Sequence, residues 1–300
     1  MNDIAISITG LTKKFLQKTV VDHLSLNVKR GEIFGFLGAN GSGKTTTLRM
    51  VCGLLTPTSG EGYCLGYNIF SQSAEIKKNI GYMPQKFSFY TGLSVYENLK
   101  FIATIYQVPN AEQAIEETIA TLGLTPYRAL QAASLSGGWK QVLALACCVI
   151  HKPHILVLDE PTAGMDPKAR KEFWDYLHNI SITQHTSVLV ATHYMDEAEK
   201  CTDIAYIHMG KLLYAGKTKD LVPFSAVKTW AWTGERSKQE ELIQEIKSSF
   251  PAILTFIVNN DLRISSRNLE QLREFIQKHH NLRFKEVFPS FEEVFILLIQ

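Results

Sequence analysis

Short apolar runs alternate with amphipathic segments from the N-terminus to about residue 222. Continuous apolar runs of a few residues are typical of strands that are buried on both faces of a sheet. They lie at 34–38, 80–84, 154–160, 187–193 and 204–210. Segments with helical character lie between them, at 45–55, 94–125 and 137–150. This alternation of strands and helices predicts an α/β domain with a mainly parallel sheet.

The block between Pro84 and Ser136 carries few strand signals. Residues 94–125 have helical character, since Leu99 and Tyr106 fall on the same helical face. We therefore predict a helical insert over about residues 86–145 within a first domain of residues 1–222.

The pattern changes after residue 222. "VKTWAW" (227–232) alternates like a strand, and "KQEELIQEIKSSF" (238–250) is helical. "LTFIVNNDLRISS" (254–266) has the form of a hairpin across an Asn-Asn-Asp turn. Residues 223–300 are therefore predicted to form a small α+β appendage.

Two helix caps are visible in the appendage. Asn268 is placed to cap one amphipathic helix, and Ser290 with Glu293 makes a capping box for a last one. The last helix could lie on a membrane, but Glu292 and Glu293 oppose anionic lipid. We expect it to pack within its own domain.

Composition narrows the class of protein. The 45% hydrophobic and 20% charged residues are typical of a folded protein. A net charge of +2 gives no reason to expect binding to nucleic acid or to an anionic membrane. Five cysteines without a C-x-x-C pair argue against disulfides and zinc and favour a reducing compartment. The start has no signal-peptide pattern, and the longest apolar run is far below the ~20 residues of a membrane span.

"GANGSGKT" (38–45) has the spacing G-x-x-x-x-G-K-[ST], between a predicted strand and a predicted helix. Backbone N–H groups of such a loop and the helix N-terminus bind phosphates, Lys44 reaches the β- and γ-phosphates, and the Thr45 hydroxyl ligates Mg²⁺. The candidate binding residues are Gly38, Ala39, Asn40, Gly41, Ser42, Gly43, Lys44, Thr45 and Thr46.

"ILVLDEP" (155–161) ends a predicted strand with two carboxylates. Asp159 would hold Mg²⁺ beside the phosphate loop, and Glu160 would polarise an attacking water. Solvated acidic residues also end many strands, but the phosphate loop makes that explanation weak here. Together the two motifs predict nucleoside triphosphate hydrolysis, and the absence of an N-K-x-D motif favours ATP.

"LSGGWKQ" (135–141) is a second phosphate-binding pattern, in which Ser136 caps a helix and the amides of Gly137 and Gly138 can face an anion. Either the helical insert folds back over its own phosphate loop, or two copies of the chain face each other and complete each other's sites. The residues alone leave both arrangements open.

Taken in order, the motifs resemble the nucleotide-binding subunit of an ATP-binding cassette (ABC) transporter, over roughly residues 4 to 221. "GANGSGKT" is similar to the Walker A loop, "LSGGWKQ" to the ABC signature and "ILVLDEP" to the Walker B strand. Gln85, Asp166 and His193 match the Q-loop, the D-loop and the switch histidine. The resemblance implies a P-loop NTPase of ABC type, with a parallel sheet core, an antiparallel β edge and a helical insert.

The same resemblance implies roles for single residues. Phe15 would stack on adenine, Gln85 would contact Mg²⁺ and the attacking water, and His193 would sense the γ-phosphate. Ser136, Gly137 and Gly138 would bind the partner chain's ATP, and Asp166 would lie at the dimer seam. Taken one at a time, Phe15, Gln85 and His193 could equally be ordinary structural residues.

Two positions depart from the family pattern. Trp139 stands where the family usually has Gln or Glu, and Val142 stands where Arg is common. We expect the dimer to form with an altered seam, in which Trp139 packs against the opposing loop or the ribose. Ala39, where proline is frequent, is expected to be neutral.

The wording of the motifs resembles exporters of drugs or hydrophobic compounds. This implies an ATPase with ATP and Mg²⁺, a second copy of the chain, and a separate multi-span permease that contacts the exported molecule. The expected location is the cytoplasmic face of the inner or plasma membrane, without a nucleic-acid partner. The alternative is a soluble ABC ATPase that acts on ribosomes or DNA. The appendage is hypothesised to stabilise or regulate the homodimer.

Overall fold

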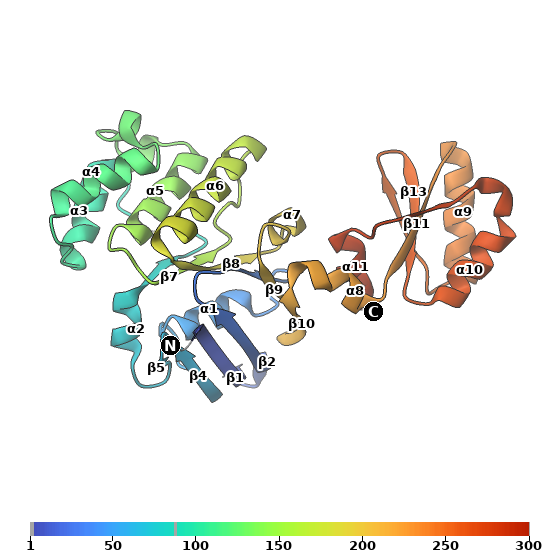
Figure 1. The fold of residues 1–300 in the computed structure, drawn as a ribbon, viewed down its shortest axis with the longest axis horizontal. Helices are drawn as coiled ribbons and strands as arrows, with labels where there is room; N and C mark the ends of the chain where they lie inside the picture. Colours follow the sequence, from blue (N-terminus) through green and yellow to red (C-terminus); the bar gives the residue numbers. More distant parts are fainter. Residues whose placement is uncertain (1–2, 87–88, 300) are drawn as a thin grey trace. The chain divides into compact units, whose positions relative to one another are not determined.

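The computed structural model describes residues 3–86 and 89–299 (Figure 1), so residues 87 and 88 of the predicted insert lie outside the described residues. The chain divides into two compact units, Met1–Ala215 and Gly216–Gln300. This division falls slightly before the boundary at residue 222 that the change in sequence pattern suggests. We describe each unit by itself.

The first unit is built on a six-stranded sheet with the order β10-β9-β3-β8-β7-β6. Strand β3 pairs in parallel with β8 and β9, and β7 pairs in parallel with β6 and β8, which confirms the predicted sheet. Strands β3, β7 and β8 are buried along their whole length, as their unbroken apolar sequences require. The strands are β3 (Ile33–Leu37), β6 (Ile80–Met83), β7 (Ile155–Asp159), β8 (Ser187–Thr192), β9 (Asp203–His208) and β10 (Lys211–Lys217).

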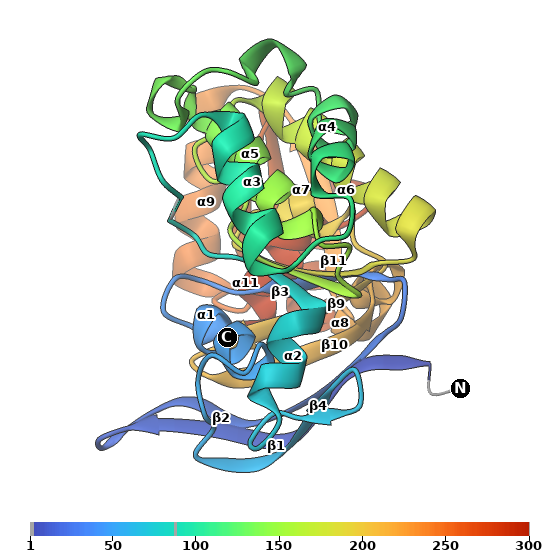
Figure 2. The same cartoon turned by 90° about the vertical axis from the view of Figure 1, so that its left-hand side faces the viewer.

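A second, antiparallel sheet with the order β2-β1-β4-β5 forms the expected β edge. Its strands are β1 (Ile4–Phe15), β2 (Lys18–Lys29), β4 (Ser59–Cys64) and β5 (Tyr67–Asn68). Helix α1 (Lys44–Val51) lies between this sheet and the parallel one (Figures 1 and 2), and Leu48 and Met50 are buried in the core that all three share. The phosphate loop is therefore held between two sheets.

The segment 94–125, predicted to be helical, is interrupted. The structure has α3 (Val95–Ile105) and α4 (Ala111–Thr121) in its place. Gln107 and Asn110 have left-handed φ values of 51° and 49°, and Pro109 between them cannot extend a helix. A Ser94–Glu97 capping box begins α3, and the break lets α3 and α4 fold side by side.

Helix α1 also ends earlier than the predicted 55, at Val51, because Gly53 adopts a left-handed φ of 63° just beyond it. The remaining helices of the first unit are α2 (Ser73–Asn79), α5 (Gly137–Val149), α6 (Pro167–Gln184) and α7 (Met195–Ala198). Short 3₁₀ helices lie at Thr125–Tyr127 and Ala132–Ser134.

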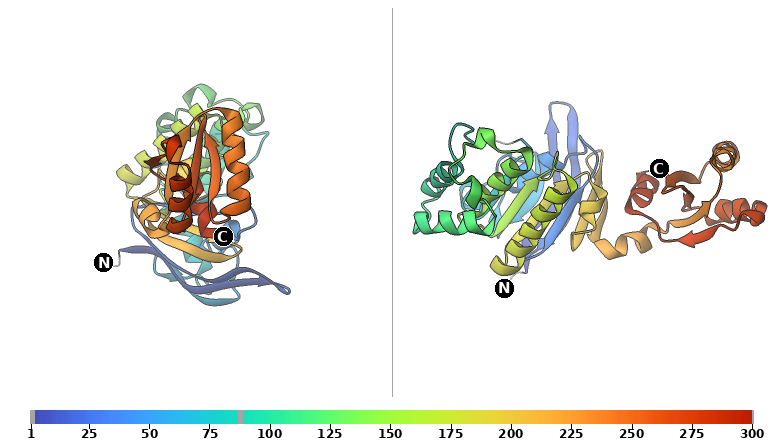
Figure 3. Two further views of the ribbon diagram at one scale, coloured as in Figure 1. Left: turned by 90° about the vertical axis from the view of Figure 1, so that its right-hand side faces the viewer. Right: turned by 90° about the horizontal axis from the view of Figure 1, so that it is seen from above.

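The second unit is a four-stranded antiparallel sheet with the order β12-β13-β11-β14, and its strands and helices alternate as β-α-β-β-α-β. Helices α9 and α10 cover one face (Figure 3), where Leu242, Phe275 and Ile264 share a core. Its elements are α8 (Leu221–Ser225), β11 (Lys228–Thr233), α9 (Arg236–Ser249), β12 (Leu254–Val258), β13 (Asp261–Ser266), α10 (Leu269–Lys278), β14 (Lys285–Val287) and α11 (Phe291–Ile299), with 3₁₀ turns at Thr218–Asp220 and His280–Leu282.

The local signals in this unit are confirmed. Asn259 and Asn260 form the two-residue hairpin turn between β12 and β13, with φ values of 50° and 70° that asparagine tolerates. The Asn268 side chain accepts hydrogen bonds from the backbone N–H groups of Glu270 and Gln271 and so caps α10.

Helix α11 packs within the unit, as expected. Its Ser290–Glu293 capping box is present, and Val294 and Phe295 are buried. The Glu293 carboxylate is 1% exposed; it lies 2.5 Å from Nε of Arg263 and accepts a hydrogen bond from Thr229. A buried ion pair therefore holds α11 against the sheet face opposite α9 and α10.

Removing one member of this pair tests its role. Arg263→Met should lower the free energy of unfolding of the second unit by about 3–5 kcal/mol, because it leaves the Glu293 charge buried without its partner. Lys238→Met, which breaks the exposed Lys238–Glu241 pair, should change it by less than about 1 kcal/mol. Hydrogen exchange of β11 and β13 amides in the full chain measures both, and equal effects would contradict the assignment.

Candidate functional site

The phosphate loop runs from the end of β3 to the start of α1 and is fitted closely against β2. Gly43 has a φ of 107°, and a Cβ atom at this position would lie 2.7 Å from the carbonyl oxygen of Val20. Only glycine satisfies both constraints. This contact fixes the last residue of the loop before the helix N-terminus, where the backbone N–H groups of α1 become available to an anion.

Lys44 is folded into the loop rather than extended into solvent. Its side chain is 4% exposed, and Nζ donates hydrogen bonds to the carbonyl oxygens of Gly38 at 2.6 Å and Ala39 at 3.1 Å. Burial lowers the pKa of the Lys44 ammonium, and the nearby carboxylates of Glu160 and Asp159 oppose that shift. The predicted phosphate ligand is thus positioned by the loop that surrounds it.

Asp159, the last residue of β7, is 1% exposed, and burial raises the pKa of its carboxyl group. A hydrogen bond with Thr45 and the charge of Lys44 oppose this shift. Its Oδ1 atom is buried without a hydrogen-bond partner in the described part of the chain. Because a buried carboxylate oxygen of this kind needs a partner, Asp159 and Thr45 fit a cation bound at this point.

Glu160 is where the predicted catalytic residues meet. Its Oε2 atom accepts a hydrogen bond from Gln85 Nε2 at 2.8 Å, and its Oε1 atom lies 3.2 Å from His193 Nδ1 and 3.7 Å from Lys44 Nζ. The residue has a left-handed φ of 50°, and its N–H donates to the carbonyl of Ala191 on β8. Such a backbone costs about 1–3 kcal/mol and is typical of functional sites.

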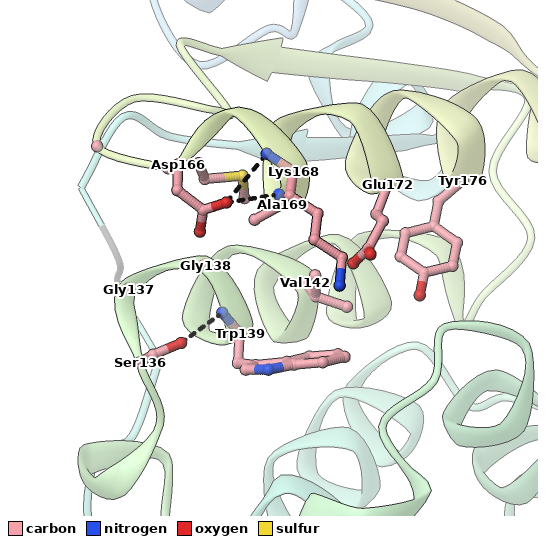
Figure 4. A pocket seen from close by; sticks show the side chains of 12 residues that line it. Ser136, Gly137, Gly138, Trp139, Val142, Asp166, Lys168, Ala169, Glu172 and Tyr176 are labelled. Carbon is pink, nitrogen blue, oxygen red and sulfur yellow. Dashed lines mark hydrogen bonds between the residues drawn. The ribbon is translucent and has the colours of Figure 1, made fainter.

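The signature residues lie elsewhere, at the N-terminus of α5. Ser136 caps the helix by accepting a hydrogen bond from the Trp139 N–H at 3.4 Å, and Ser136 and Gly137 are exposed. They line a cavity of about 460 Å³ between the first turns of α5 and α6 (Figure 4), together with Asp166. None of the described residues that line it belongs to the phosphate loop.

Trp139 does not project from the signature turn. Its ring centroid is 4.5 Å from that of Tyr127, and it also approaches Gly123. Figure 4 shows the indole lying along α5 below Val142, whose side chain is buried. Within one chain the indole packs on the helical insert, and its contact with an opposing loop or a ribose stays a prediction.

Phe15 ends β1 with 46% of its surface exposed, so it is not a core residue. Lys13 Nζ lies 5.1 Å from the centre of its ring, which shows that one face accepts a cation. Val20 of the following strand touches the phosphate loop at Gly43, so the β1–β2 hairpin that carries this exposed ring contacts the loop.

Sequence reasoning missed one group of residues next to the site. Arg170, Tyr194 and Glu197 are brought together from α6 and the segment after β8. The sequence gives a weak signal for them, because a charged residue on an amphipathic helix is usually on its solvated face.

The fit of Gly43 can be tested directly. Gly43→Ala introduces strain of about 1–3 kcal/mol and a backbone clash, so ATP affinity should fall roughly tenfold or more. Gly92→Ala, which places a methyl group in open space, should leave affinity unchanged. Titration with a fluorescent ATP analogue measures both variants once melting temperatures have shown that each is folded. Wild-type affinity in Gly43→Ala would contradict the tight fit.

Comparison with known proteins connects this geometry to a family. The family model described as "ABC transporter" matches residues 21–163. The probable multidrug ABC transporter ATP-binding protein YbhF of Escherichia coli (strain K12) is 43% identical over 75% of this chain. The match covers 39% of YbhF, so the chain spans well under half the length of that relative.

Other relatives match over more of their own length. The bacitracin transport ATP-binding protein BcrA of Bacillus licheniformis is 38% identical over 74% of this chain and 71% of its own. The Nod factor export ATP-binding protein I of Neorhizobium galegae is 31% identical over 98% of this chain and 85% of its own, so that match includes the second unit.

Solved structures share the fold. The dimeric post-hydrolysis structure of the ATP-binding cassette MJ0796 with ADP and Pi is 25% identical, with a TM-score of 0.65 over 71% of this chain and 98% of its own. CbiO1 of Clostridium perfringens is 24% identical, with a TM-score of 0.69 over 83% of this chain and 97% of its own.

Proposed function

The chain belongs to the ABC transporter family, and from this premise we propose that it binds and hydrolyses ATP to drive export of a drug-like or hydrophobic compound. The observation that carries the proposal is the convergence of Lys44, Gln85 and His193 on the Glu160 carboxylate at the end of β7. Phosphate binding and water activation are thereby assigned to one small volume.

In this proposal Glu160 accepts a proton from the water that attacks the γ-phosphate. The hydrogen bond from Gln85 and the contact with His193 fix the orientation of its carboxylate. A triphosphate in the loop offers Lys44 Nζ stronger acceptors than the carbonyls of Gly38 and Ala39. Phe15 supplies an exposed ring for the base, a contact worth about 1–3 kcal/mol by analogy with nucleic-acid stacking.

Mg²⁺ would be held by Thr45 and Asp159, with Gln85 contributing its amide oxygen. Bound with ATP, the ion would neutralise charge on the β- and γ-phosphates. The unpartnered Oδ1 of Asp159 supports this assignment, and the chain's part is to keep that carboxylate fixed at the end of β7.

We further propose that Ser136, Gly137 and Gly138 bind the ATP of a second copy of the chain, with Asp166 at the seam. Ser136 and Gly137 are exposed at a helix N-terminus, which favours an anion from outside the chain. Support also comes from the similar cassette MJ0796, which was solved as a dimer.

The partner we propose is a separate membrane permease, which contacts the exported molecule and holds this chain at the cytoplasmic face of the membrane. The names of relatives, which refer to bacitracin transport and Nod factor export, support an export role. Within the described residues, no helix has the length and apolar character that crossing a membrane requires.

Glu160→Gln tests water activation and dimerisation together. Turnover should fall about a hundredfold or more, because the amide cannot accept the proton. With ATP and Mg²⁺ the variant should sediment as a dimer, whereas Glu160→Gln with Ser136→Arg should bind ATP as a monomer. Glu199→Gln, on an exposed residue, is the matched control. Wild-type turnover in Glu160→Gln, or a Glu160→Gln single variant that stays monomeric with ATP and Mg²⁺, would overturn the proposal.

Asp159→Asn tests the metal site. Affinity for ATP in the presence of Mg²⁺ should fall by about tenfold or more, because a carboxylate ligand becomes neutral. Affinity in the presence of EDTA should be unchanged, since no other contact of the nucleotide is lost. Equal losses under both conditions would show that Asp159 supports the fold of the loop and not the ion.

A further inference from the structure

The group that contains Arg170, Tyr194 and Glu197 connects two parts of the site. The guanidinium of Arg170 lies 4.5 Å from the centre of the Tyr194 ring, and its Nη1 donates to Asp196 Oδ2 at 3.2 Å. Its Nε lies 3.9 Å from Glu197 Oε1. One arginine therefore contacts three residues of the segment that follows His193.

This contact is tied to the core by a buried charge. Glu197 is fully buried, and its carboxylate accepts a hydrogen bond from the hydroxyl of Thr162, which follows the Glu160-Pro161 pair at the end of β7. Its Oε2 atom has no hydrogen-bond partner in the described part of the chain. Because an unpaired buried carboxylate is costly, Glu197 holds the cationic side chain of Arg170 in place.

Each end of this group reaches a residue of the proposed mechanism. Arg170 lies one turn after Asp166, the proposed seam residue, and its backbone N–H donates to the Asp166 carbonyl at 3.0 Å. At the other end the ring of Tyr194 is 4.1 Å from that of His193, which in turn lies 3.2 Å from Glu160. A continuous series of contacts runs from the seam to the catalytic carboxylate.

We propose that Arg170 is a positioning residue that couples the seam at Asp166 to the orientation of His193. The inference rests on the proposed function, because it needs a seam that closes around ATP. Displacement of the first turn of α6 moves the guanidinium, the guanidinium carries the Tyr194 ring, and Tyr194 sets the place of His193 beside Glu160. Arginine suits this role because its planar guanidinium stacks on a ring while it bonds carboxylates at its edge.

Steady-state kinetics of the full chain tests the coupling. Arg170→Met should lower kcat about tenfold or more while the KM for ATP stays within about twofold, since catalysis is more sensitive than binding to a small displacement. Arg170→Lys should have a kcat between those of the wild type and Arg170→Met, because lysine keeps the charge but loses the stacking of the guanidinium on the Tyr194 ring.

The matched control is Arg128→Met, since Arg128 lies 4.2 Å above the Tyr96 ring and 2.7 Å from Glu116 in the helical insert. It removes the same kind of contact away from the site and should leave kcat unchanged.

A second pair of variants separates coupling from folding. Tyr194→Phe keeps the ring and should retain wild-type kcat, whereas Tyr194→Leu should lose kcat as Arg170→Met does. In the Glu160→Gln background, Arg170→Met should still form the ATP dimer, at the same protein concentration as Glu160→Gln alone. The inference is overturned if both Arg170→Met and Tyr194→Leu keep the wild-type kcat. It is also overturned if Arg170→Met raises the KM for ATP and lowers the melting temperature in parallel with its loss of kcat. Failure of Glu160→Gln itself to dimerise overturns the proposed function instead.

Discussion

The carboxylate of Glu160 is the point on which the proposed active site depends. It follows directly on a strand that is buried along its whole length, and a left-handed backbone turns it away from Asp159. Two adjacent carboxylates thereby acquire different surroundings, since one has a buried oxygen without a partner among the described residues and the other is contacted by Gln85, His193 and Lys44. In the proposed function, the division of labour between metal binding and water activation follows from this single turn of the chain.

The strand pattern and the phosphate loop could be predicted from the sequence because both are local. Buried parallel strands have continuous apolar runs, and the loop needs glycine at fixed positions. The helix break at Pro109 was missed because an apolar period persists across it, although Pro109 and Asn110 are visible in the sequence. The packing of Trp139 on Tyr127 could not be found in this way, since it depends on how the insert folds.

In the second unit, too, local features could be predicted from the sequence and long-range contacts could not. Its hairpin and both helix caps follow from short-range signals, and all three are present in the structure. The capping carboxylate of Glu293 also pairs with Arg263 from a strand about thirty residues earlier, which no local pattern indicates. Glu293, which the sequence presents as an exposed cap, is thus the buried charge that fixes the last helix. Glu197 near the proposed active site was missed for the same reason, since a buried glutamate cannot be told from an exposed one by its local sequence.

A buried lysine next to a buried carboxylate explains why ATP binding and water activation would be linked. Lys44 now shares its ammonium among the carbonyls of Gly38 and Ala39 and the carboxylate of Glu160, and burial already lowers its pKa. Phosphate oxygens carry more charge than carbonyls and compete for the same Nζ. If Lys44 turns toward them, Glu160 loses one cationic neighbour. In the proposed function, the residue that binds the phosphates is therefore also a neighbour of the carboxylate that activates the attacking water, at 3.7 Å between Lys44 Nζ and Glu160 Oε1.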